Sequence, residues 1–185
     1  TAIGRAKACQ VPVMPSTASS ATLAEIEQVF AAQGGSGVVI KAVGGGGGRG
    51  MRVVRSRAEL AAAYARCQSE ARSAFGVDAV YAERLVVRAR HIEVQIVGDG
   101  RQVIALGERE CTLQRRFQKL VEMAPSPRLD AGLRAQIIDA ARRIAARVGY
   151  RSLGTFEFLV EENEDGRQTG FVFIEANPRL QVEHT

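Results

Sequence analysis

Tryptophan is absent from this 185-residue sequence, and cysteine occurs only three times. Cys9, Cys67 and Cys111 are odd in number, widely separated and without CxxC spacing, which argues against a disulfide framework and a structural zinc site. Aromatic residues make up 5% of the chain, which leaves little for base stacking. The net charge is +5, but the basic residues are scattered among acids, so we expect no nucleic-acid partner.

Long apolar segments are also missing. No run approaches the length that spans a bilayer, and the first residues do not have the pattern of a signal peptide. We therefore expect no membrane partner and a cytoplasmic location. Hydrophobic residues at 46% and charged residues at 24% are ordinary for a globular protein with a real core.

Lysine is the rarest of the charged residues. Of 25 basic residues only Lys7, Lys41 and Lys119 are lysine, and the others are arginine. Where arginine is the default cation, a retained lysine indicates a need for a compact point charge, such as a phosphate-binding group requires. Two of the three, Lys41 and Lys119, fall inside the motifs described below.

The most distinctive motif is the run of glycines at 44–48, which follows Lys41 and lies between β-type stretches at 38–40 and 51–54. Five glycines are unfavourable in a structural turn, but they bring bare backbone N–H groups close to anionic oxygens. A Walker loop is excluded because its lysine would follow the glycines and precede a helix. A dinucleotide-binding fingerprint lacks its helix here, and a flexible hairpin loop stays open. The motif favours a lid over a nucleoside triphosphate.

Hydrophobic periodicity predicts an α+β fold. In the first half we expect a strand at 11–14, a helix from a Thr22 capping box, strands at 37–41 and 51–54, a helix from a Ser56 capping box to about Phe75, and a strand at 79–83. In the second half we expect strands at 91–97, 102–109, 154–160 and 171–177, and a helix from Asp130 to Gly149. The layout predicts a small lobe that carries the lid and a larger, mainly antiparallel lobe.

Strand 91–97 alternates cleanly between apolar and polar residues. Ile92, Val94 and Ile96 are predicted to face inward, and His91, Glu93 and Gln95 to share the opposite face.

Two glutamates become neighbours if the last two strands pair as a hairpin centred on Gly166, because Glu157 and Glu175 are equally distant from it. Phe and Leu residues flank both, and a carboxylate in such surroundings is unfavourable without a counter-charge. Oxygen ligands of this kind suit Mg²⁺, or Mn²⁺ as an alternative. We expect a metal site at Glu157 and Glu175 with Asn177 as an auxiliary ligand; two solvated glutamates are the competing interpretation.

The polar pattern continues past this site as Arg179, Gln181 and Glu183. A forked cation, an amide donor and a carboxylate near a metal could bind a small planar anion and remove its proton. Ordinary polar loop residues are the alternative.

Five segments together resemble the ATP-grasp module of biotin carboxylases, the ATP-using components of acyl-CoA, pyruvate and urea carboxylases. They are residues 41–50, 89–95, 108–119, 154–157 and 173–185, in the order found in that family. The resemblance implies an ATP-grasp fold. Residues 1–10 would be a linker from a preceding domain, 11–85 the lid lobe, and 86–185 the N-terminal part of the core lobe.

The resemblance also implies site residues. The ATP-binding positions would be Lys41, Gly44, Gly45, Gly46, Gly47, Gly48, Glu83, Arg84, Leu85, His91, Gln114 and Leu159, with 83–85 as the adenine hinge. The metal ligands would be Glu157, Glu175 and Asn177. Bicarbonate would be bound by Lys119, Arg179, Gln181 and the backbone of Val182, with Glu183 as general base and Lys119 and Arg179 as catalytic cations.

The implied reaction begins with attack of bicarbonate on the γ-phosphate of ATP, which gives carboxyphosphate and then CO₂. Biotin on a carrier domain outside this chain would accept the CO₂. The implied partners are therefore ATP, bicarbonate, and biotin carrier and carboxyltransferase domains or subunits, in an oligomeric parent protein.

Two positions depart from the family pattern. Phe117 stands where a polar residue is usual, so a nucleotide hydrogen bond is expected to be lost there, and Glu110 replaces the commoner Asp. The family also has a further phosphate-binding lysine before the segment that matches this chain and a biotin-binding arginine after it. We expect a segment of a larger enzyme that is inactive in isolation. Another ATP-grasp ligase, such as a carbamoyl-phosphate synthetase, and a non-catalytic nucleotide-binding module remain as alternatives.

Overall fold

The computed structural model describes residues 2–34, 36–45 and 50–181. The chain divides into two compact units. Unit 1 comprises Thr1–Val13, Arg88–Arg115 and Lys119–Thr185, and unit 2 comprises Met14–Val87 and Arg116–Gln118. Within the described ranges, no helix combines the length and the apolar character that crossing a membrane requires.

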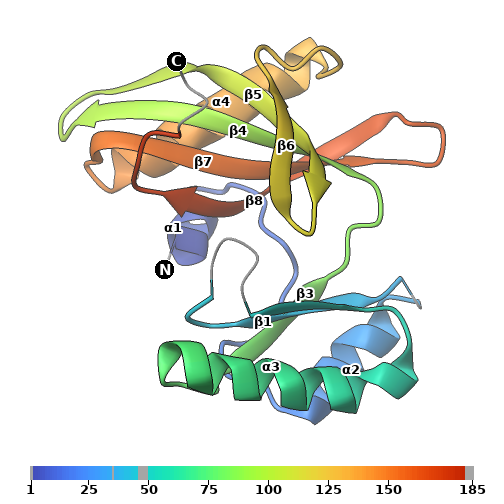
Figure 1. The fold of residues 1–185 in the computed structure, drawn as a ribbon. Coiled ribbons are helices and arrows are strands. Elements are labelled where there is room, and N and C mark those ends of the chain that lie inside the picture. Colours follow the sequence, from blue (N-terminus) through green and yellow to red (C-terminus); the bar gives the residue numbers. More distant parts are fainter. Residues whose placement is uncertain (1, 35, 46–49, 182–185) are drawn as a thin grey trace. The chain divides into compact units, whose positions relative to one another are not determined.

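Unit 2 contains a three-stranded antiparallel sheet with helices on one side (Figure 1). Its elements are α2 (Leu23–Ala32), β1 (Val38–Ala42), β2 (Met51–Val54), the 3₁₀ helix η1 (Arg57–Glu59), α3 (Leu60–Phe75) and β3 (Val80–Arg84). The central strand β1 pairs with both β2 and β3. Alternate residues of β1, Val38 and Ile40, are fully buried and pack in one core with Ile26 of α2 and Leu60 of α3. This alternation is the reason that both helices cover the same face.

The two predicted capping boxes have different outcomes. The first is confirmed: the Thr22 backbone N–H donates to Glu25 Oε2 at 2.7 Å, and the Glu25 N–H donates to Thr22 Oγ1 at 3.3 Å. The Ser56 box is wrong, because the Ser56 side chain makes no capping bond and a 3₁₀ turn precedes α3. The helix does end at Phe75 as predicted, and Gly76 follows with a φ of 75°.

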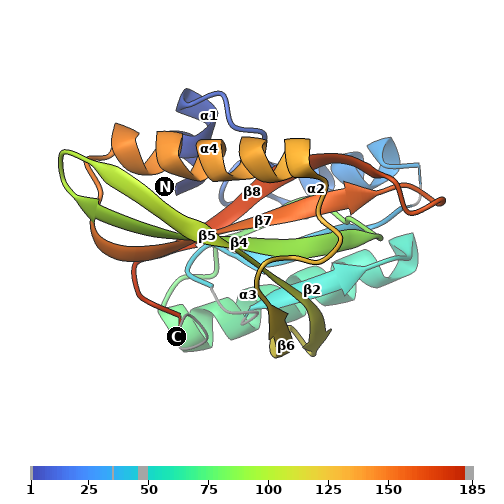
Figure 2. The same cartoon turned by 90° about the horizontal axis from the view of Figure 1, so that it is seen from above.

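Unit 1 contains a five-stranded antiparallel sheet in the order β6-β5-β4-β7-β8. Its elements are α1 (Ala2–Ala8), β4 (Ala89–Asp99), β5 (Val103–Arg115), β6 (Gln118–Met123), α4 (Ala131–Arg147), β7 (Arg151–Glu162) and β8 (Gln168–Asn177). Helix α4 lies along one face of the sheet (Figure 2). Ile92, Val94 and Ile96 are fully buried in the core on this face with Ile137 of α4, which confirms the predicted inward positions of β4.

Three local expectations in unit 1 need correction. Residues 1–10, expected as a linker, contain α1, whose Ala6 is buried in the core. The strand expected at 11–14 is reduced to one bridge between Val13 and Phe173, because Pro12 has no N–H to continue a ladder. Strand β6 was not expected from the sequence, and β5 extends beyond the predicted 102–109 to Arg115.

The hairpin of β7 and β8 confirms the predicted pairing of Glu157 with Glu175. The register is not uniform, however. It shifts between Glu157 and Phe158 and again between Glu161 and Glu162. Such bulges bend a strand and increase its twist. The strands also extend further than expected, to Glu162 and from Gln168, so the connecting loop is shorter.

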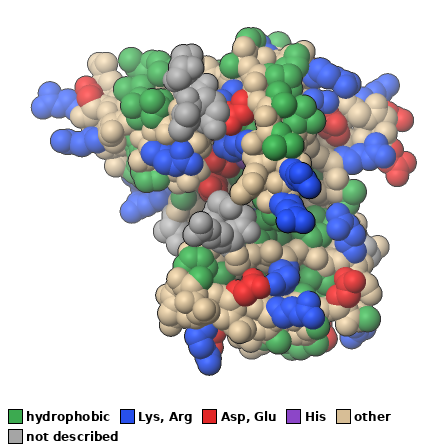
Figure 3. All heavy atoms as spheres, in the orientation of Figure 1, with side chains coloured by type: hydrophobic (Ala, Val, Ile, Leu, Met, Phe, Trp, Pro, Cys, Tyr) green, Lys and Arg blue, Asp and Glu red, His purple; other side chains and the backbone are tan. Residues whose placement is uncertain are grey.

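Large hydrophobic side chains remain exposed on two neighbouring strands. Figure 3 shows hydrophobic side chains over β6 and the adjoining part of β5. The exposed members on these strands are Ile104, Leu106, Leu113, Leu120 and Val121. The apolar face of unit 1 toward α4 is buried, so this exposure lies outside the core described above.

The turn between β5 and β6 generates a stability prediction. Arg116 and Phe117 have φ values of 51° and 64°, and both are non-glycine residues in the left-handed region. A two-residue hairpin turn with two positive φ angles favours Asn-Gly. We expect the double variant Arg116→Asn, Phe117→Gly to raise the free energy of unfolding by about 1 kcal/mol, since a left-handed non-glycine residue costs roughly that amount. Urea denaturation measures the change.

The matched control for this turn is Phe117→Ala, which removes the ring but keeps a Cβ in the left-handed region. We expect it to show no such gain. Equal stability of the double variant and the wild type would contradict the prediction.

Candidate functional site

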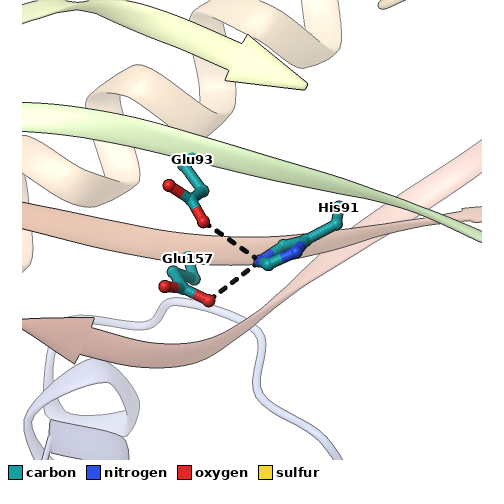
Figure 4. Close-up of side chains that lie close together, drawn as sticks. All are labelled: His91, Glu93 and Glu157. Carbon is teal, nitrogen blue, oxygen red and sulfur yellow. Dashed lines mark hydrogen bonds and ion pairs between the residues drawn. The ribbon is translucent and has the colours of Figure 1, made fainter. Parts of the chain in front are cut away.

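A histidine and two glutamates form the centre of a polar cluster on the sheet face opposite α4 (Figure 4). His91 and Glu93 lie on β4, and Glu157 lies on β7 directly opposite Glu93 in the strand register. His91 Nε2 is 2.9 Å from Glu157 Oε2 and 3.7 Å from Glu93 Oε1. One ligand atom from each residue lies within 4.8 Å of the others. The predicted polar face of β4 is therefore correct, and on it Glu93 and Gln95 are fully buried.

Gln114 fixes the protonation pattern of the His91 ring. The Gln114 Nε2 group lies 2.7 Å from the Cys111 carbonyl oxygen, which can only accept, so the amide nitrogen must face it. The same nitrogen is 2.7 Å from His91 Nδ1. Nδ1 therefore accepts a hydrogen bond, and the ring proton is on Nε2, where it donates to Glu157. The contacts define a neutral imidazole aimed at a carboxylate.

Two cations compensate the buried carboxylates. Arg109 of β5 donates through Nε and Nη2 to Glu93 Oε2, at 3.0 and 2.6 Å. Lys119 of β6 pairs with the other oxygen of Glu93 and lies 3.8 Å from Glu157 Oε1. Burial acts to lower the pKa of Lys119, but the hydrogen bond to Glu93 and the charges of Glu157 and Glu93 outweigh it and raise that pKa. Lys119 is therefore positively charged at neutral pH.

The Glu157 carboxylate is ionised despite its burial. Burial acts to raise its pKa, but the hydrogen bond from His91 and the charge of Lys119 hold the pKa below its usual value. An ionised carboxylate in this position can accept a metal ion without first losing a proton.

Asn177 connects Glu157 to Glu175, the second predicted metal ligand. Its Nδ2 group donates to Glu157 Oε1 at 2.7 Å and to Glu175 Oε1 at 3.0 Å. The amide thus presents a partial positive charge to both carboxylates, as a bound cation would. Two carboxylates and an amide that can offer its oxygen form an all-oxygen set of the kind that Mg²⁺ prefers. The structure brings together all three predicted metal ligands.

A second group of potential ligands is less suited to a metal. Glu93, Cys111 and Glu122 also have ligand atoms within 4.8 Å of one another. Burial and the nearby Glu93 charge raise the pKa of the Cys111 thiol, so it remains protonated. Arg109 lies 3.3 Å from Glu122 in addition to its bonds with Glu93, so a cation already faces this group. Of the free cysteines, Cys67 and Cys111 are buried, whereas Cys9 is partly exposed.

Arg179 and Gln181 lie together at the end of β8. Arg179 Nη1 donates to Gln181 Oε1 at 2.6 Å, and the Thr155 hydroxyl donates to the Arg179 carbonyl at 3.4 Å. Gln181 is only 2% exposed. Its Nε2 group is buried without a hydrogen-bond partner among the described residues. A buried orphan donor is unusual and points to a missing acceptor. The predicted Val182 and Glu183 lie outside the described residues.

Several of the predicted nucleotide-binding residues of unit 2 already make hydrogen bonds within that unit. Lys41 Nζ donates to Glu83 Oε2 at 2.5 Å, across the pairing of β1 with β3. In the predicted hinge, the Arg84 N–H donates to the Pro15 carbonyl and the Leu85 N–H to the Gly37 carbonyl. A nucleotide would therefore have to use other groups of this segment. Leu159, in unit 1, is paired with His91 in the register of β4 and β7.

Close packing explains why glycine is found at the two ends of this glycine-rich segment, Gly44 and Gly50. A Cβ on Gly44 would lie 3.0 Å from both Cβ and Cγ of Phe75. Gly50 has a φ of 67°, and a Cβ there would lie 2.8 Å from the Ala42 Cβ. Gly45 donates its N–H to the Ala42 carbonyl. Gly46, Gly47 and Gly48 lie outside the described residues, so their predicted role as a phosphate lid stays a prediction.

Sequence reasoning missed the buried partners of the site. Glu93 was assigned to the polar face without a role. Neither Arg109 as its partner nor Thr155 as a contact of Arg109 was identified. Arg109 is 3% exposed, and its Nη2 lies 3.4 Å from Thr155 Oγ1. The signal that could have found them was the alternation of β4. Charged residues on one face of a central strand become buried, and they then require counter-charges from the neighbouring strands.

Comparison with known proteins identifies this arrangement. Residues 1–185 match the family model described as "Carbamoyl-phosphate synthase L chain, ATP binding domain". The chain is 48% identical over 182 residues to a pyruvate carboxylase of Bacillus subtilis, covering 98% of this chain and 15% of that protein. It is 46% identical over 179 residues to the mitochondrial pyruvate carboxylase of Homo sapiens, covering 96% of this chain and 15% of that protein. The chain thus spans about 15% of the length of these curated relatives.

Solved structures give the same result. A biotin carboxylase from Campylobacter jejuni, solved as a β-γ-ATP complex, has a TM-score of 0.88 and 43% identity over 99% of this chain and 40% of its own. The biotin carboxylase domain of the Hydrogenobacter thermophilus 2-oxoglutarate carboxylase, in complex with MgADP, ADP and bicarbonate, has a TM-score of 0.87 and 38% identity over 98% of this chain and 39% of its own.

These similarities confirm the predicted α+β ATP-grasp fold, which the chain shares with biotin carboxylases. The match over all 185 residues means that the chain belongs to the family of carbamoyl-phosphate synthase L chain, ATP-binding domains.

Proposed function

We propose that this chain is the ATP- and magnesium-binding part of a biotin carboxylase, which uses ATP to activate bicarbonate and carboxylates biotin on a carrier domain. The observation that carries the proposal is the position of Glu157. This ionised carboxylate is joined to Glu175 through Asn177 and also lies beside the protonated Lys119. The proposed metal site thus lies next to a positive charge that can bind an anion. A reaction between two anions, here ATP and bicarbonate, requires both to be held side by side.

In this proposal Glu157, Glu175 and Asn177 hold Mg²⁺, with Mn²⁺ as a possible substitute. The fit rests on the bridging Asn177 amide, which occupies the space between the two carboxylates. When bound, the metal would supply charge neutralisation for the phosphates of ATP. His91 keeps Glu157 oriented through its Nε2–H.

For the nucleotide we assign the phosphates to Lys41 and the glycines 44–48, and the adenine to residues 83–85. Gln114, His91 and Leu159 are assigned to the nucleoside. Lys41 would have to exchange Glu83 for a phosphate oxygen, which a flexible, compact ammonium can do. Support comes from the likeness to a biotin carboxylase solved with a β-γ-ATP ligand.

Bicarbonate is assigned to Lys119, Arg179, Gln181 and the Val182 backbone, with Glu183 as the general base. The buried Gln181 Nε2 donor without a partner supports an acceptor at this position. Lys119 and Arg179 would hold the planar anion in line with the γ-phosphate and stabilise the charge that develops as carboxyphosphate forms. Glu183 would then take the proton from the ureido nitrogen of biotin, so that this nitrogen can attack the CO₂ released together with phosphate from carboxyphosphate.

Biotin would supply a ureido nitrogen that accepts the carboxyl group. The carrier and carboxyltransferase domains, and an oligomeric parent protein, belong to the proposal for the whole enzyme. The relatives named pyruvate carboxylase support this context. The family description also covers carbamoyl-phosphate synthases, which makes another ATP-grasp ligase the second candidate.

The discriminating experiment is an ATPase assay on the full-length protein that carries this chain. We expect Mg²⁺-dependent ATP hydrolysis that requires bicarbonate and that free biotin stimulates. Hydrolysis that depends on bicarbonate but does not respond to biotin would favour the carbamoyl-phosphate type of ligase. No nucleotide binding at all would overturn the proposal.

The division of roles between two glutamates can be tested by a matched pair of variants. We expect Glu175→Gln to weaken Mg·ATP binding at least about tenfold, because a metal ligand loses its charge. Glu183→Gln should leave Mg·ATP binding intact and abolish biotin carboxylation. Calorimetric titration and a carboxylation assay measure the two effects. Equal loss of nucleotide binding in both variants would contradict the assignment.

Lys119 supports a third prediction. Replacing it by Gln removes a charged hydrogen-bond donor, which we expect to raise the KM for bicarbonate by about 10- to 100-fold, in line with a charged hydrogen bond. Lys119→Arg, which keeps the charge, should lose less. Steady-state kinetics at saturating ATP separates the two variants. An unchanged bicarbonate KM in Lys119→Gln would show that the lysine serves only to neutralise Glu93.

A further inference from the structure

Thr112 connects the His91 backbone to a second buried cluster. Its Oγ1 accepts the His91 backbone N–H at 3.1 Å and donates to Glu110 Oε1 at 2.8 Å. The pairing of β4 with β5 begins at Ile92 opposite Glu110. At His91 a side-chain hydroxyl therefore takes the place of a main-chain partner, at the point where β5 separates from β4.

Glu110 is a fixed anchor for this hydroxyl. It is 1% exposed, and both of its oxygens are in use. Oε1 also accepts from Arg90 Nη1 at 2.8 Å, and Oε2 accepts from the Ser126 hydroxyl at 2.6 Å. Arg90 is held in turn by Glu162 of β7 at 2.6 Å. Burial acts to raise the pKa of Glu110, but the hydrogen bonds from Ser126 and Thr112 and the charge of Arg90 outweigh it and lower that pKa.

These contacts leave the Thr112 hydroxyl one orientation. An ionised carboxylate accepts only and a backbone N–H donates only, so the hydroxyl proton points to Glu110 and a lone pair to His91. The backbone of His91 is thereby held from one side, while its ring is held from the other by Gln114 and Glu157. After Glu110, β5 is no longer paired with β4. Further along β5, the Gln114 side chain still contacts His91 Nδ1.

We propose that Thr112 is a positioning residue of the nucleotide- and metal-binding centre. Through its bond to the buried Glu110 it fixes the His91 backbone, and so sets where the imidazole meets Glu157. The inference rests on the proposed function for its effect on Mg·ATP, but its effect on the His91 ring is independent of that function.

The test compares Thr112→Val with Thr112→Ser in the full-length protein. Valine keeps the branched shape but removes the hydroxyl, whereas serine keeps the hydroxyl. We expect the valine variant to bind Mg·ATP about 5- to 10-fold more weakly, a loss of the size of one hydrogen bond. The serine variant should stay within about twofold of the wild type on the same scale. In kinetics the loss should appear in the KM for ATP and leave kcat at saturating ATP nearly unchanged.

A second measurement detects the ring directly. NMR of ¹⁵N-histidine-labelled protein reports imidazole nitrogens, and the His91 signals are assigned as those that disappear in a His91→Gln variant. We expect the valine variant to shift both His91 signals and the serine variant to restore them. A role in stability alone would leave these signals in place. If the valine variant does not fold, Thr112→Ala replaces it, because alanine removes the hydroxyl without placing a methyl group in its position.

The outcomes separate the two proposals. Unchanged His91 signals and unchanged Mg·ATP affinity in a folded valine variant would overturn the positioning role, while the wild type still binds Mg·ATP. A shift that serine fails to restore would overturn it as well. If the wild type does not bind Mg·ATP, the proposed function fails, and the His91 signals still decide whether Thr112 positions the ring.

Discussion

The burial of Glu93 and Glu157 on facing strands is the constraint from which the rest of unit 1 follows. Two carboxylates opposite each other in a sheet repel, and removal from water adds a further penalty of several kcal/mol per charge. Arg109 and Lys119 offset this by bonding to Glu93 from β5 and β6, and His91 donates to Glu157. Strands β5 and β6 must therefore place these cations on the same face. The site and the strand arrangement are consequences of one charge balance.

The two faces of the sheet in unit 1 perform separate tasks. The face toward α4 is apolar, with Ile92, Val94 and Ile96 in the core. Around Glu93, Gln95 and Glu157 the other face is polar and yet buried, so these side chains satisfy one another instead of water. Because β-strand side chains alternate, a single strand, β4, supplies both the core and the site. A change in its register would exchange the two faces, which is why the pairing of β4 with β7 is continuous from Ala89 to Asp99.

The sequence predicted those parts that depend on local pattern or symmetry. The Thr22 cap, the end of α3 and the facing pair Glu157 and Glu175 were correct because each depends on a short pattern or a single hairpin. The Ser56 box failed because a 3₁₀ turn competes with the capping geometry. The bonds of Glu93 with Arg109 and Lys119 could not be predicted, because they depend on a shifted β4–β5 register and on a strand, β6, with no clear alternation of its own. The family resemblance supplied the proposed roles of the site residues, which spacing alone could not supply.

Direct location of the metal tests the account most sharply. Crystals of the full-length protein grown with Mn²⁺ and a non-hydrolysable ATP analogue would show the ion by anomalous diffraction. The account predicts an anomalous peak within coordination distance of the Glu157 and Glu175 carboxylates, with the Asn177 amide displaced from between them. A peak beside Glu93, Cys111 and Glu122, or a bound nucleotide with no ion near Glu157, would contradict it.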